Sequence, residues 1–322
     1  MKLVIQIPCL NEEATLPVTV ADLPRTVPGF DTVELLVIDD GSSDRTSEVA
    51  RQLGAQRVVR FASHRGLARA FAIGLSEALA MGADVVVNTD ADNQYRGADV
   101  LQLVQPILER RADMVIGARP IEDIPHFSPV KKTLQRLGSA VVRTLSRVDV
   151  PDATSGFRAY SRDAVLRLTV ITNFTYTLET IIQAGQKSIA VTSVPVHTNG
   201  KLRESRLFRG VWSYVGHSLV TILRVWVLYQ PLRFFLVLGA PCFAGALVAL
   251  ARYAWLALRT PGPAGHLPTL LVGCALAVIG VLLAAIGVLG DLTAMNRRLM
   301  EEVVINTRLQ RSDRARTPGA RP

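Results

Sequence analysis

The chain has 322 residues and a formal net charge of +9, and 49% of its residues are hydrophobic, which is high for a soluble protein. Two stretches without a charged residue, 234–251 and 267–290, are each long enough to cross a membrane as a helix. A signal peptide is not expected, because Glu12 and Glu13 interrupt the first apolar run. The three cysteines have neither metal-binding nor redox spacing.

The charge is unevenly distributed along the chain. Residues 1–109 hold 9 Lys and Arg against 15 Asp and Glu, whereas residues 110–230 hold 17 against 8. An acidic first part suits a metal site, and a basic second part suits an anionic partner. No nucleic-acid-binding motif is present, so we expect no nucleic acid and favour anionic lipid next to the apolar stretches.

Apolar runs alternate with helical patterns along the first 120 residues. This alternation predicts an α/β fold with a parallel, doubly wound sheet. We expect a helix that contains Leu16, Val20 and Leu23, and another that ends at Leu53 with Ser43 as its N-cap. The expected strands are 2–7, 33–38, 56–61, 85–87, 114–117 and 189–196, with a short strand after the loop 152–158. Two further helices are expected at 66–81 and 98–110.

Two carboxylates, Asp90 and Asp92, directly follow the expected strand 85–87, with the amide of Gln94 close behind. Ligands bind at the carboxyl ends of strands in open α/β sheets. These oxygen ligands suit Mg²⁺ or Mn²⁺, which would take further ligands from substrate phosphates. The alternative is a polar turn that closes a strand, because Asp and Asn favour turns.

Three ordered motifs carry a resemblance to a known family: Pro8-Cys9-Leu10-Asn11-Glu12, Asp39-Asp40-Gly41-Ser42-Ser43-Asp44 and Asp90-Ala91-Asp92-Asn93-Gln94. They resemble the signatures of family 2 glycosyltransferases, which are inverting enzymes with a GT-A nucleotide-sugar-binding fold. With its two apolar stretches, the chain most resembles polyprenyl-phosphate glycosyltransferases such as dolichol-phosphate mannosyltransferases and bactoprenol glucosyltransferases. The resemblance covers residues 1 to about 295.

The resemblance implies roles for individual residues. Asp90, Asp92 and Gln94 would hold Mg²⁺ or Mn²⁺, and Asp90, Asp92 and Arg119 would carry the catalysis. Asn93 departs from the close relatives, which usually have Leu there. An Asx turn is the alternative for Asp39 and Asp40. The nucleotide sugar would contact Pro8, Asn11, Glu12, Asp39, Asp40, Asp90, Ala91, Asp92, Asp152 and Gly156.

The acceptor side is basic. By resemblance, the acceptor phosphate would be bound by Arg119, Lys131, Arg203, Ser205 and Arg206. A solvated helix face is the alternative for the basic residues after Arg119, and a linker is the alternative for 197–206. A polyprenyl phosphate has a second pKa near ~6 and is largely dianionic at neutral pH, so we expect no general base, including Asp152.

The remainder of the chain is organised by hydropathy and charge. We expect a catalytic domain at 1–206, an amphipathic juxtamembrane helix at 207–230, transmembrane helices at 231–258 and 267–293, and a basic tail at 294–322, disordered after Arg311. Basic residues flank the two spans on the side of the termini, whereas the turn at 260–267 has none, although Arg252 and Arg259 lie just before it. The catalytic domain and both termini should therefore be cytoplasmic.

These features together predict a multi-pass membrane enzyme. It would transfer one sugar, with inversion, from a nucleoside-diphosphate sugar to polyprenyl phosphate at the cytoplasmic membrane face. Two alternatives are a glycosyltransferase with another lipid or polysaccharide acceptor, and a non-catalytic membrane scaffold with the same fold. A homo-oligomer is left open, and the sequence does not identify the sugar, the nucleotide or the polyprenol.

Overall fold

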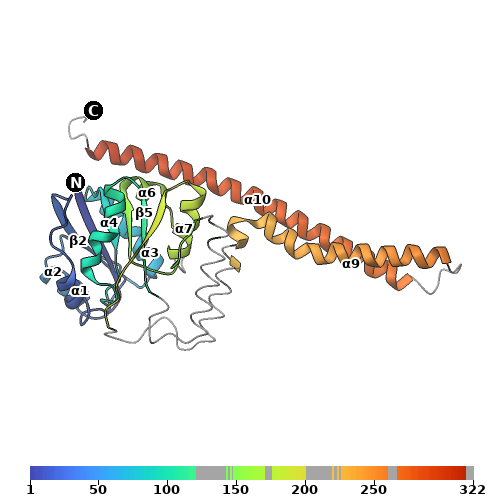
Figure 1. The fold of residues 1–322 in the computed structure, drawn as a ribbon, viewed down its shortest axis with the longest axis horizontal. Coiled ribbons are helices and arrows are strands. Elements are labelled where there is room, and N and C mark those ends of the chain that lie inside the picture. The colour runs from blue at the N-terminus through green and yellow to red at the C-terminus, as the bar shows by residue number, and fades with distance from the viewer. Residues whose placement is uncertain are drawn as a thin grey trace. The chain divides into compact units, whose positions relative to one another are not determined.

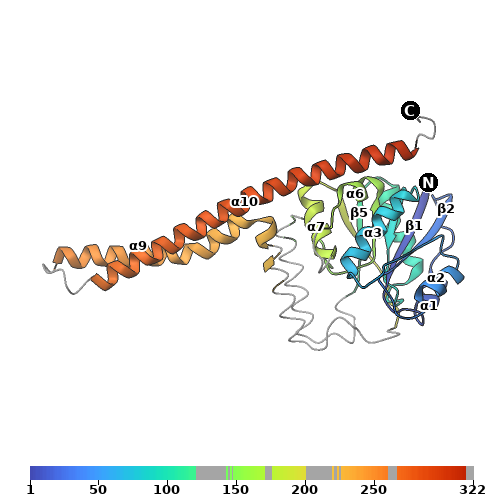
Figure 2. The same ribbon diagram turned by 180° about the vertical axis from the view of Figure 1, so that it is seen from behind.

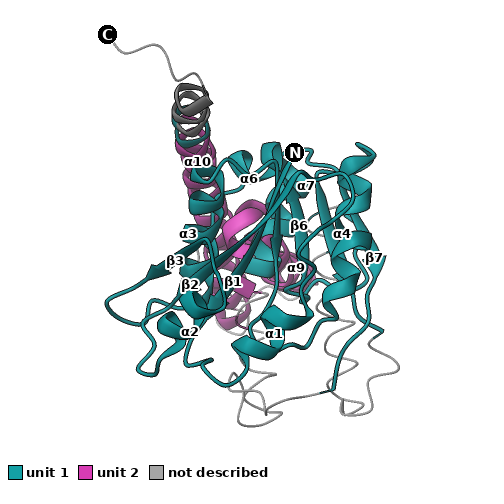
Figure 3. Cartoon of the chain, turned by 90° about the vertical axis from the view of Figure 1, so that its left-hand side faces the viewer, with its two compact units in different colours: residues 1–219, 304–322 teal, residues 220–303 magenta. Residues whose placement is uncertain are grey.

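A computed structural model describes residues 1–120, 143, 146, 148–170, 176–200, 220, 223–224, 226–259 and 267–316 of the chain. It divides into two compact units, which Figure 3 colours separately. The first unit comprises residues 1–219 and 304–322, and the second comprises residues 220–303.

The first unit is built on a seven-stranded sheet with the order β3-β2-β1-β4-β6-β5-β7. Every strand expected from the sequence is present. The expectation of an all-parallel sheet was wrong at β6, which runs antiparallel to both β4 and β5. The strands are β1 (Lys2–Cys9), β2 (Thr32–Asp39), β3 (Arg57–Arg60), β4 (Val85–Asn88), β5 (Met114–Ala118), β6 (Arg158–Ser161) and β7 (Val191–Pro195).

Helices cover both faces of this sheet (Figures 1 and 2). α1 (Leu16–Asp22), α2 (Thr46–Gln52) and α4 (Val100–Leu108) pack on the face that carries Leu3, Ile5 and Ile7 of β1. The 3-10 helix η1 (Gly97–Asp99) leads into α4. The opposite face is covered by α3 (Leu67–Ala80), α6 (Arg162–Arg167) and α7 (Tyr176–Gln186).

Close packing of α3 on the sheet depends on one glycine. A Cβ at Gly74 would lie 2.5 Å from the side-chain oxygen of Gln6 and 2.9 Å from Cδ1 of Ile38. A larger residue at this position would therefore push α3 away from β1 and β2.

The start of α2 differs from the expectation. Ser43 is not its N-cap, because the helix begins at Thr46 after Arg45 and has no side-chain cap at that position. Asp44 satisfies the first turn instead, since its Oδ1 accepts a hydrogen bond from the Thr46 amide at 3.0 Å. Ser43 donates its amide to Asn11 Oδ1 at 2.8 Å and belongs to the loop before the helix.

The topology gathers loops at one edge of the sheet. β1 pairs in parallel with β2 on one side and with β4 on the other, so the direction of strand addition reverses at β1. The carboxyl ends of β1 to β5 and of β7 lie at the same edge as the start of the antiparallel β6. We call this edge the carboxyl edge. Ligands of open α/β sheets bind at such a reversal point.

The second unit contains α9 (Pro231–Arg259), which has 29 residues, and most of α10 (Leu267–Arg316), which has 50. Both helices are long and apolar enough to cross a membrane. Gly273, Gly280 and Gly287 recur every seven residues on α10, and a Cβ on each would lie 3.0–3.1 Å from a side-chain atom of α9. These glycines allow the two helices to pack closely.

Two expectations concern this part of the chain. α10 continues beyond the expected span 267–293 as far as Arg316, so the expectation of disorder after Arg311 was wrong for residues 312–316. The extension is rich in Arg, Leu, Met and Glu, which are good helix formers. Of the expected amphipathic helix at 207–230, residues 207–219 lie outside the described part of the chain, and residues 226–229 are helical.

Candidate active site

Asp90 and Asp92 lie just beyond the end of β4, in a turn that we call the metal turn (residues 90–95). Both are half-buried. Asn93 adopts the left-handed conformation with φ 53°, and Asp92 Oδ1 accepts a hydrogen bond from the Gln94 amide at 3.2 Å. The structure therefore places the three expected metal ligands on one short turn at the carboxyl edge.

A glycine lies beside the carboxylate of Asp90. A Cβ at Gly156 would lie 2.9 and 3.0 Å from the two carboxylate oxygens of Asp90, so a side chain at this position would crowd both oxygens. Among the described residues, no three His, Cys, Asp or Glu side chains form a metal-binding group. A cation held here would therefore be completed by Gln94, water and substrate oxygens, as is usual for Mg²⁺.

Tyr95 connects the metal turn to the loop before β6. Its hydroxyl oxygen accepts a hydrogen bond from the Gly156 amide at 3.1 Å, and its ring stacks on Phe157 with 5.0 Å between centroids. Burial raises the pKa of Tyr95, so the phenol stays neutral. Sequence reasoning missed Tyr95 because an aromatic residue near a strand end is ordinarily part of the core.

A buried polar network holds the loop before β6 in place. The Asn88 side-chain amide donates to the Gly156 carbonyl at 2.8 Å and to the Tyr176 hydroxyl at 3.0 Å. Gln6 donates in turn to Asn88 Oδ1 at 2.9 Å. The Tyr176 ring stacks on Phe71 with 3.9 Å between centroids. Buried networks of this kind fix a single geometry, and here they fix the position of Gly156 beside Asp90.

Arg119 and Asp152 form a buried ion pair at the carboxyl edge. Arg119 Nε lies 2.7 Å from Asp152 Oδ2, and Arg119 Nη2 lies 3.1 Å from Asp152 Oδ1 and 2.8 Å from the Thr154 hydroxyl. The side chains are 9% and 1% exposed, respectively. Burial alone would raise the pKa of Asp152, but Arg119 and Thr154 lower it below its usual value. Both residues were predicted from the sequence as site residues, but the contact between them was not predicted.

The acidic pair at the end of β2 is engaged by the chain itself. Asp39 is fully buried, and its oxygens accept hydrogen bonds from the Ser42 amide at 2.8 Å and from the Ser47 hydroxyl. Asp40 accepts the amides of Arg65 at 2.7 Å and Gly66 at 2.9 Å. Asp39 and Asp40 therefore form turns with side-chain to main-chain hydrogen bonds, which is the alternative to a ligand-binding role that the sequence left open.

The end of β1 forms the neighbouring loop. Pro8 pairs with Ile38 in the register of β1 and β2. Asn11 is left-handed with φ 54° and donates its amide to Ser42 Oγ at 2.9 Å. Glu12 is buried and donates its amide to Thr46 Oγ1 at 2.8 Å. The first two motifs thus form one interlocked pair of loops.

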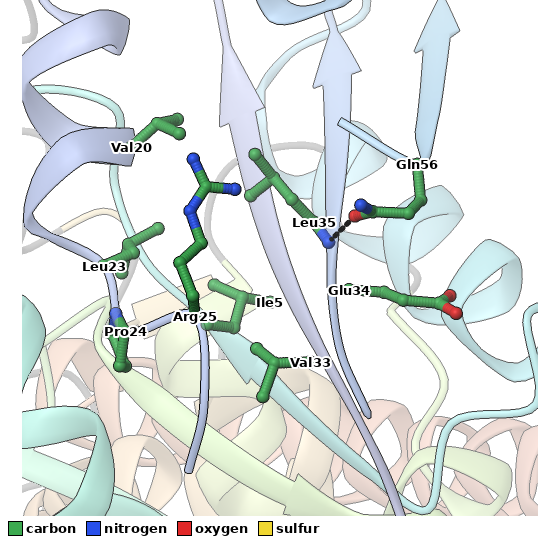
Figure 4. Close-up of a pocket in the computed structure, with 9 residues that line it drawn as sticks. All are labelled: Ile5, Val20, Leu23, Pro24, Arg25, Val33, Glu34, Leu35 and Gln56. Carbon is green, nitrogen blue, oxygen red and sulfur yellow. Dashed lines mark hydrogen bonds between the residues drawn. The ribbon is translucent and has the colours of Figure 1, made fainter. Parts of the chain in front are cut away.

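The described residues of this unit include the lining of two cavities. One of about 420 Å³ opens at the ends of β2 and β3 and is lined by Gly41, Ser42, Arg60, Phe61 and Ala62. The other, of about 20 Å³, lies between α1 and the sheet, with Val20, Arg25 and Leu35 among its lining residues (Figure 4). None of the predicted site residues lines the smaller cavity, so it is not part of the site.

The described part of the site thus brings together the donor-side and metal residues predicted from the sequence. Arg119 lies among them at the end of β5. The other predicted acceptor residues, Lys131, Arg203, Ser205 and Arg206, lie outside the described residues.

Comparisons with known proteins agree with this geometry. Residues 4–169, more than half of the chain, match the family model for glycosyl transferase family 2. The chain is 28% identical over 235 residues to an undecaprenyl-phosphate mannosyltransferase of Micrococcus luteus, covering 70% of this chain and 93% of that protein. It is 27% identical over 214 residues to a UDP-N-acetylglucosamine–dolichyl-phosphate N-acetylglucosaminyltransferase of Methanococcus voltae, covering 60% and 83%.

A solved structure supports the fold assignment. Glucosyl-3-phosphoglycerate synthase of Mycobacterium tuberculosis, in complex with Mn²⁺, UDP-glucose and phosphoglyceric acid, is 25% identical with a TM-score of 0.53, covering 69% of this chain and 79% of that one. The sheet therefore has the GT-A fold. By its motifs, its fold and its match to the family model, this chain belongs to glycosyltransferase family 2 and is a glycosyltransferase.

Proposed function

We propose that this enzyme transfers a single sugar, with inversion, from a nucleoside-diphosphate sugar to a polyprenyl phosphate at the cytoplasmic face of a membrane. The observation that carries the proposal is the gathering of Asp90, Asp92, Gln94, Asp152 and Gly156 at one end of the sheet. Two helices long enough to span a membrane and the names of the two curated relatives support a lipid-linked phosphate as the acceptor.

The donor diphosphate would bind at the metal turn. Asp90, Asp92 and Gln94 would hold Mg²⁺ or Mn²⁺, and such an ion neutralises the charge that develops on a departing nucleoside diphosphate. Its use is supported by Gly156, which has no side chain to crowd the Asp90 oxygens, and by the Mn²⁺ and UDP-glucose in the structural relative. Ala91 and Gly156 would lie close to the diphosphate and the sugar.

The nucleoside would bind over the ends of β1 to β3. The cavity of about 420 Å³ next to Gly41 and Ser42 is large enough for a base or a ribose. Pro8, Asn11 and Glu12 would shape its wall. Because Asp39 and Asp40 already bind amide and hydroxyl groups of the chain, their part in nucleotide binding is to hold these loops in place.

The transfer step requires no general base from the protein. The second pKa of an alkyl phosphate is near ~6, so the acceptor oxygen is already deprotonated at neutral pH. Asp152 is ionised and paired with Arg119, an arrangement that suits orienting the sugar. Catalysis would then consist of alignment of the two substrates and stabilisation of the leaving group.

The acceptor phosphate would be bound by Arg119, Lys131, Arg203, Ser205 and Arg206. A charge-assisted hydrogen bond from arginine to phosphate contributes roughly 1.5–3 kcal/mol. Arg206→Ala should therefore raise the acceptor KM about ten- to a hundred-fold and leave the donor KM nearly unchanged. Arg206→Lys should restore only part of the loss, because lysine lacks the planar fork. Steady-state kinetics with both substrates varied measures this, and an equal change in both KM values would contradict the assignment.

The membrane arrangement is part of the same proposal. Residues 1–206 would form the cytoplasmic catalytic domain, 207–230 a helix at the membrane surface, and 231–258 and 267–293 the two spans. The basic residues from 294 onward would face the cytoplasm. Labelling of single cysteines placed at 263 and 318 with a membrane-impermeant thiol reagent, in a background without native cysteines, tests this arrangement. Only position 263 should react from outside the cell.

A donor screen tests the reaction itself. The purified protein is incubated with undecaprenyl phosphate, Mn²⁺ and one of several UDP- or GDP-sugars, and lipid-linked product is followed by mass spectrometry. Product with the lipid phosphate, but not with diacylglycerol or an oligosaccharide, would support the proposal. Donor hydrolysis without transfer to any lipid phosphate would contradict it, and the absence of both reactions would favour a scaffold.

A further inference from the structure

The segment that follows β7 is bound to the metal turn. The Asn199 amide donates to the Gln94 carbonyl at 2.9 Å. Its side-chain nitrogen Nδ2 lies 3.2 Å from the Asn93 carbonyl oxygen and 3.4 Å from the Tyr95 carbonyl oxygen. Thr198 also forms an isolated antiparallel bridge with Tyr95. One residue of a distant segment thus contacts three consecutive carbonyl groups of the turn that carries Gln94.

The opposite side of the turn is held by α1. The Thr19 hydroxyl donates to the Ala91 carbonyl at 2.9 Å, and Asp22 Oδ2 accepts the Gly97 amide at 2.6 Å. The turn between these two points includes the left-handed Asn93, a conformation that persists when its surroundings stabilise it. Asn199 supplies this stabilisation from the side of β7.

We infer that Asn199 is a positioning residue for the divalent-metal site. The inference rests on the proposed metal role of Asp90, Asp92 and Gln94. Asn199 would not touch the metal; its side chain binds the carbonyl groups of Asn93 and Tyr95, on either side of Gln94, and thereby fixes the point from which the Gln94 side chain reaches the metal. Loss of such outer contacts typically weakens metal binding about 10- to 100-fold.

The arrangement of oxygens around Nδ2 gives a sharp electrostatic distinction. Besides the two carbonyl oxygens, Asp22 Oδ2 lies 3.4 Å from it. Asn199→Ala removes the Nδ2 donor and keeps the main-chain bond to Gln94, whereas Asn199→Asp places a negative oxygen among three oxygen acceptors at almost unchanged volume. The Asp variant should therefore disturb the turn more than the Ala variant does.

The experiment is a titration of the full-length protein with Mn²⁺ alone, in which free Mn²⁺ is measured by electron paramagnetic resonance. We expect Asn199→Ala to raise the Mn²⁺ Kd about tenfold, and Asn199→Asp to raise it further. His197→Ala is the matched control. It removes an exposed side chain two residues away, its main-chain contacts remain, and it should leave the Kd unchanged.

A double variant tests whether Asn199 acts through Gln94. In a Gln94→Ala background, Asn199→Ala should change the Mn²⁺ Kd less than about twofold, because the ligand it positions is gone. A full tenfold effect in that background would overturn the role. Circular dichroism melts check that each variant is folded. If Asn199→Asp does not fold, Asn199→Ala and the double variant with Gln94→Ala still test the role of Asn199.

The outcomes separate this inference from the proposed function. If Asp92→Asn binds Mn²⁺ as well as the native protein does, the proposed metal site itself fails. If Asp92→Asn loses Mn²⁺ but both Asn199 variants bind it normally, the metal site stands and only the role of Asn199 is overturned.

Discussion

The ends of β2 and β4 each carry a pair of aspartates, yet the structure uses the two pairs differently. Asp39 and Asp40 are 0% and 3% exposed, and their oxygens accept hydrogen bonds from main-chain amides and a serine hydroxyl. Asp90 and Asp92 are half-buried on a turn whose neighbour, Gly156, has no side chain to crowd the Asp90 oxygens. An acidic pair at a strand end can therefore maintain a loop or face a ligand, and burial of its oxygens distinguishes the two uses.

The largest expected effect is the loss of turnover in Asp92→Asn. If this carboxylate binds the cation, its loss should lower kcat about 10³-fold or more, because metal stabilisation of the leaving group supplies several kcal/mol. The melting temperature should change little. Removal of divalent metal with a chelator should give the same loss in the native enzyme. Full activity in the chelator would refute the metal assignment. The β4 pair would then no longer differ from the β2 pair in binding a cation.

The next largest effect concerns the ion pair between Arg119 and Asp152. Arg119→Met leaves a buried carboxylate without its cation and should destabilise the catalytic unit by about 3 kcal/mol. Adding Asp152→Asn to that variant should recover part of the loss, since no buried charge then remains unpaired. Thermal melts of the single and double variants measure this. Equal melting temperatures for native protein and Arg119→Met would show that the pair does not stabilise the fold.

A smaller effect is expected at the β2 pair. Asp40→Ala leaves the amides of Arg65 and Gly66 without their acceptor and should cost about 1–3 kcal/mol of stability. Mn²⁺ binding should be unchanged, which is the reverse of the Asp92 result. Asp31→Ala, at an exposed position, is the control for removal of a negative charge. A weakened Mn²⁺ affinity in Asp40→Ala would mean that both aspartate pairs serve the metal.

The smallest effect is on the pH profile. Because the pKa of Asp152 is lowered in the folded protein, Asp152 stays ionised at all pH values above its usual pKa of about 4, and its pairing with Arg119 is lost only in stronger acid. Log kcat/KM for the acceptor should therefore rise with pH to a plateau set by the acceptor phosphate, near ~6. Asp152→Asn should lower the plateau without shifting its midpoint. A variant with no detectable product but normal donor binding would identify Asp152 as a general base.

Much of this site could be predicted because it depends on strand ends. Short β-branched runs followed by Asp or Asn identify both the strand and the loop that follows it, as for Asp90 after β4. The contact between Arg119 and Asp152 could not be predicted in the same way. It depends on β6, a four-residue strand whose first residue is a buried arginine, and neither its length nor its composition indicates that it runs antiparallel.

The roles of the supporting residues could not be predicted from the sequence either, and the reason is physical. Tyr95, Tyr176 and Asn88 act through hydrogen bonds between segments far apart in the chain, and no local periodicity reports such contacts. The length of α10, in contrast, could have been predicted. Disorder was expected after Arg311, yet α10 continues to Arg316, because arginine and glutamate favour helices when leucine and methionine accompany them.

The antiparallel direction of β6 has a consequence for how the chain closes the carboxyl edge. Because β5 ends and β6 begins at the same edge, the chain leaves β5 at Arg119 and approaches β6 through Asp152, and these two residues are joined by hydrogen bonds. One buried ion pair therefore holds together the two ends of the connection between β5 and β6. A change at either residue acts on both ends of this connection at once.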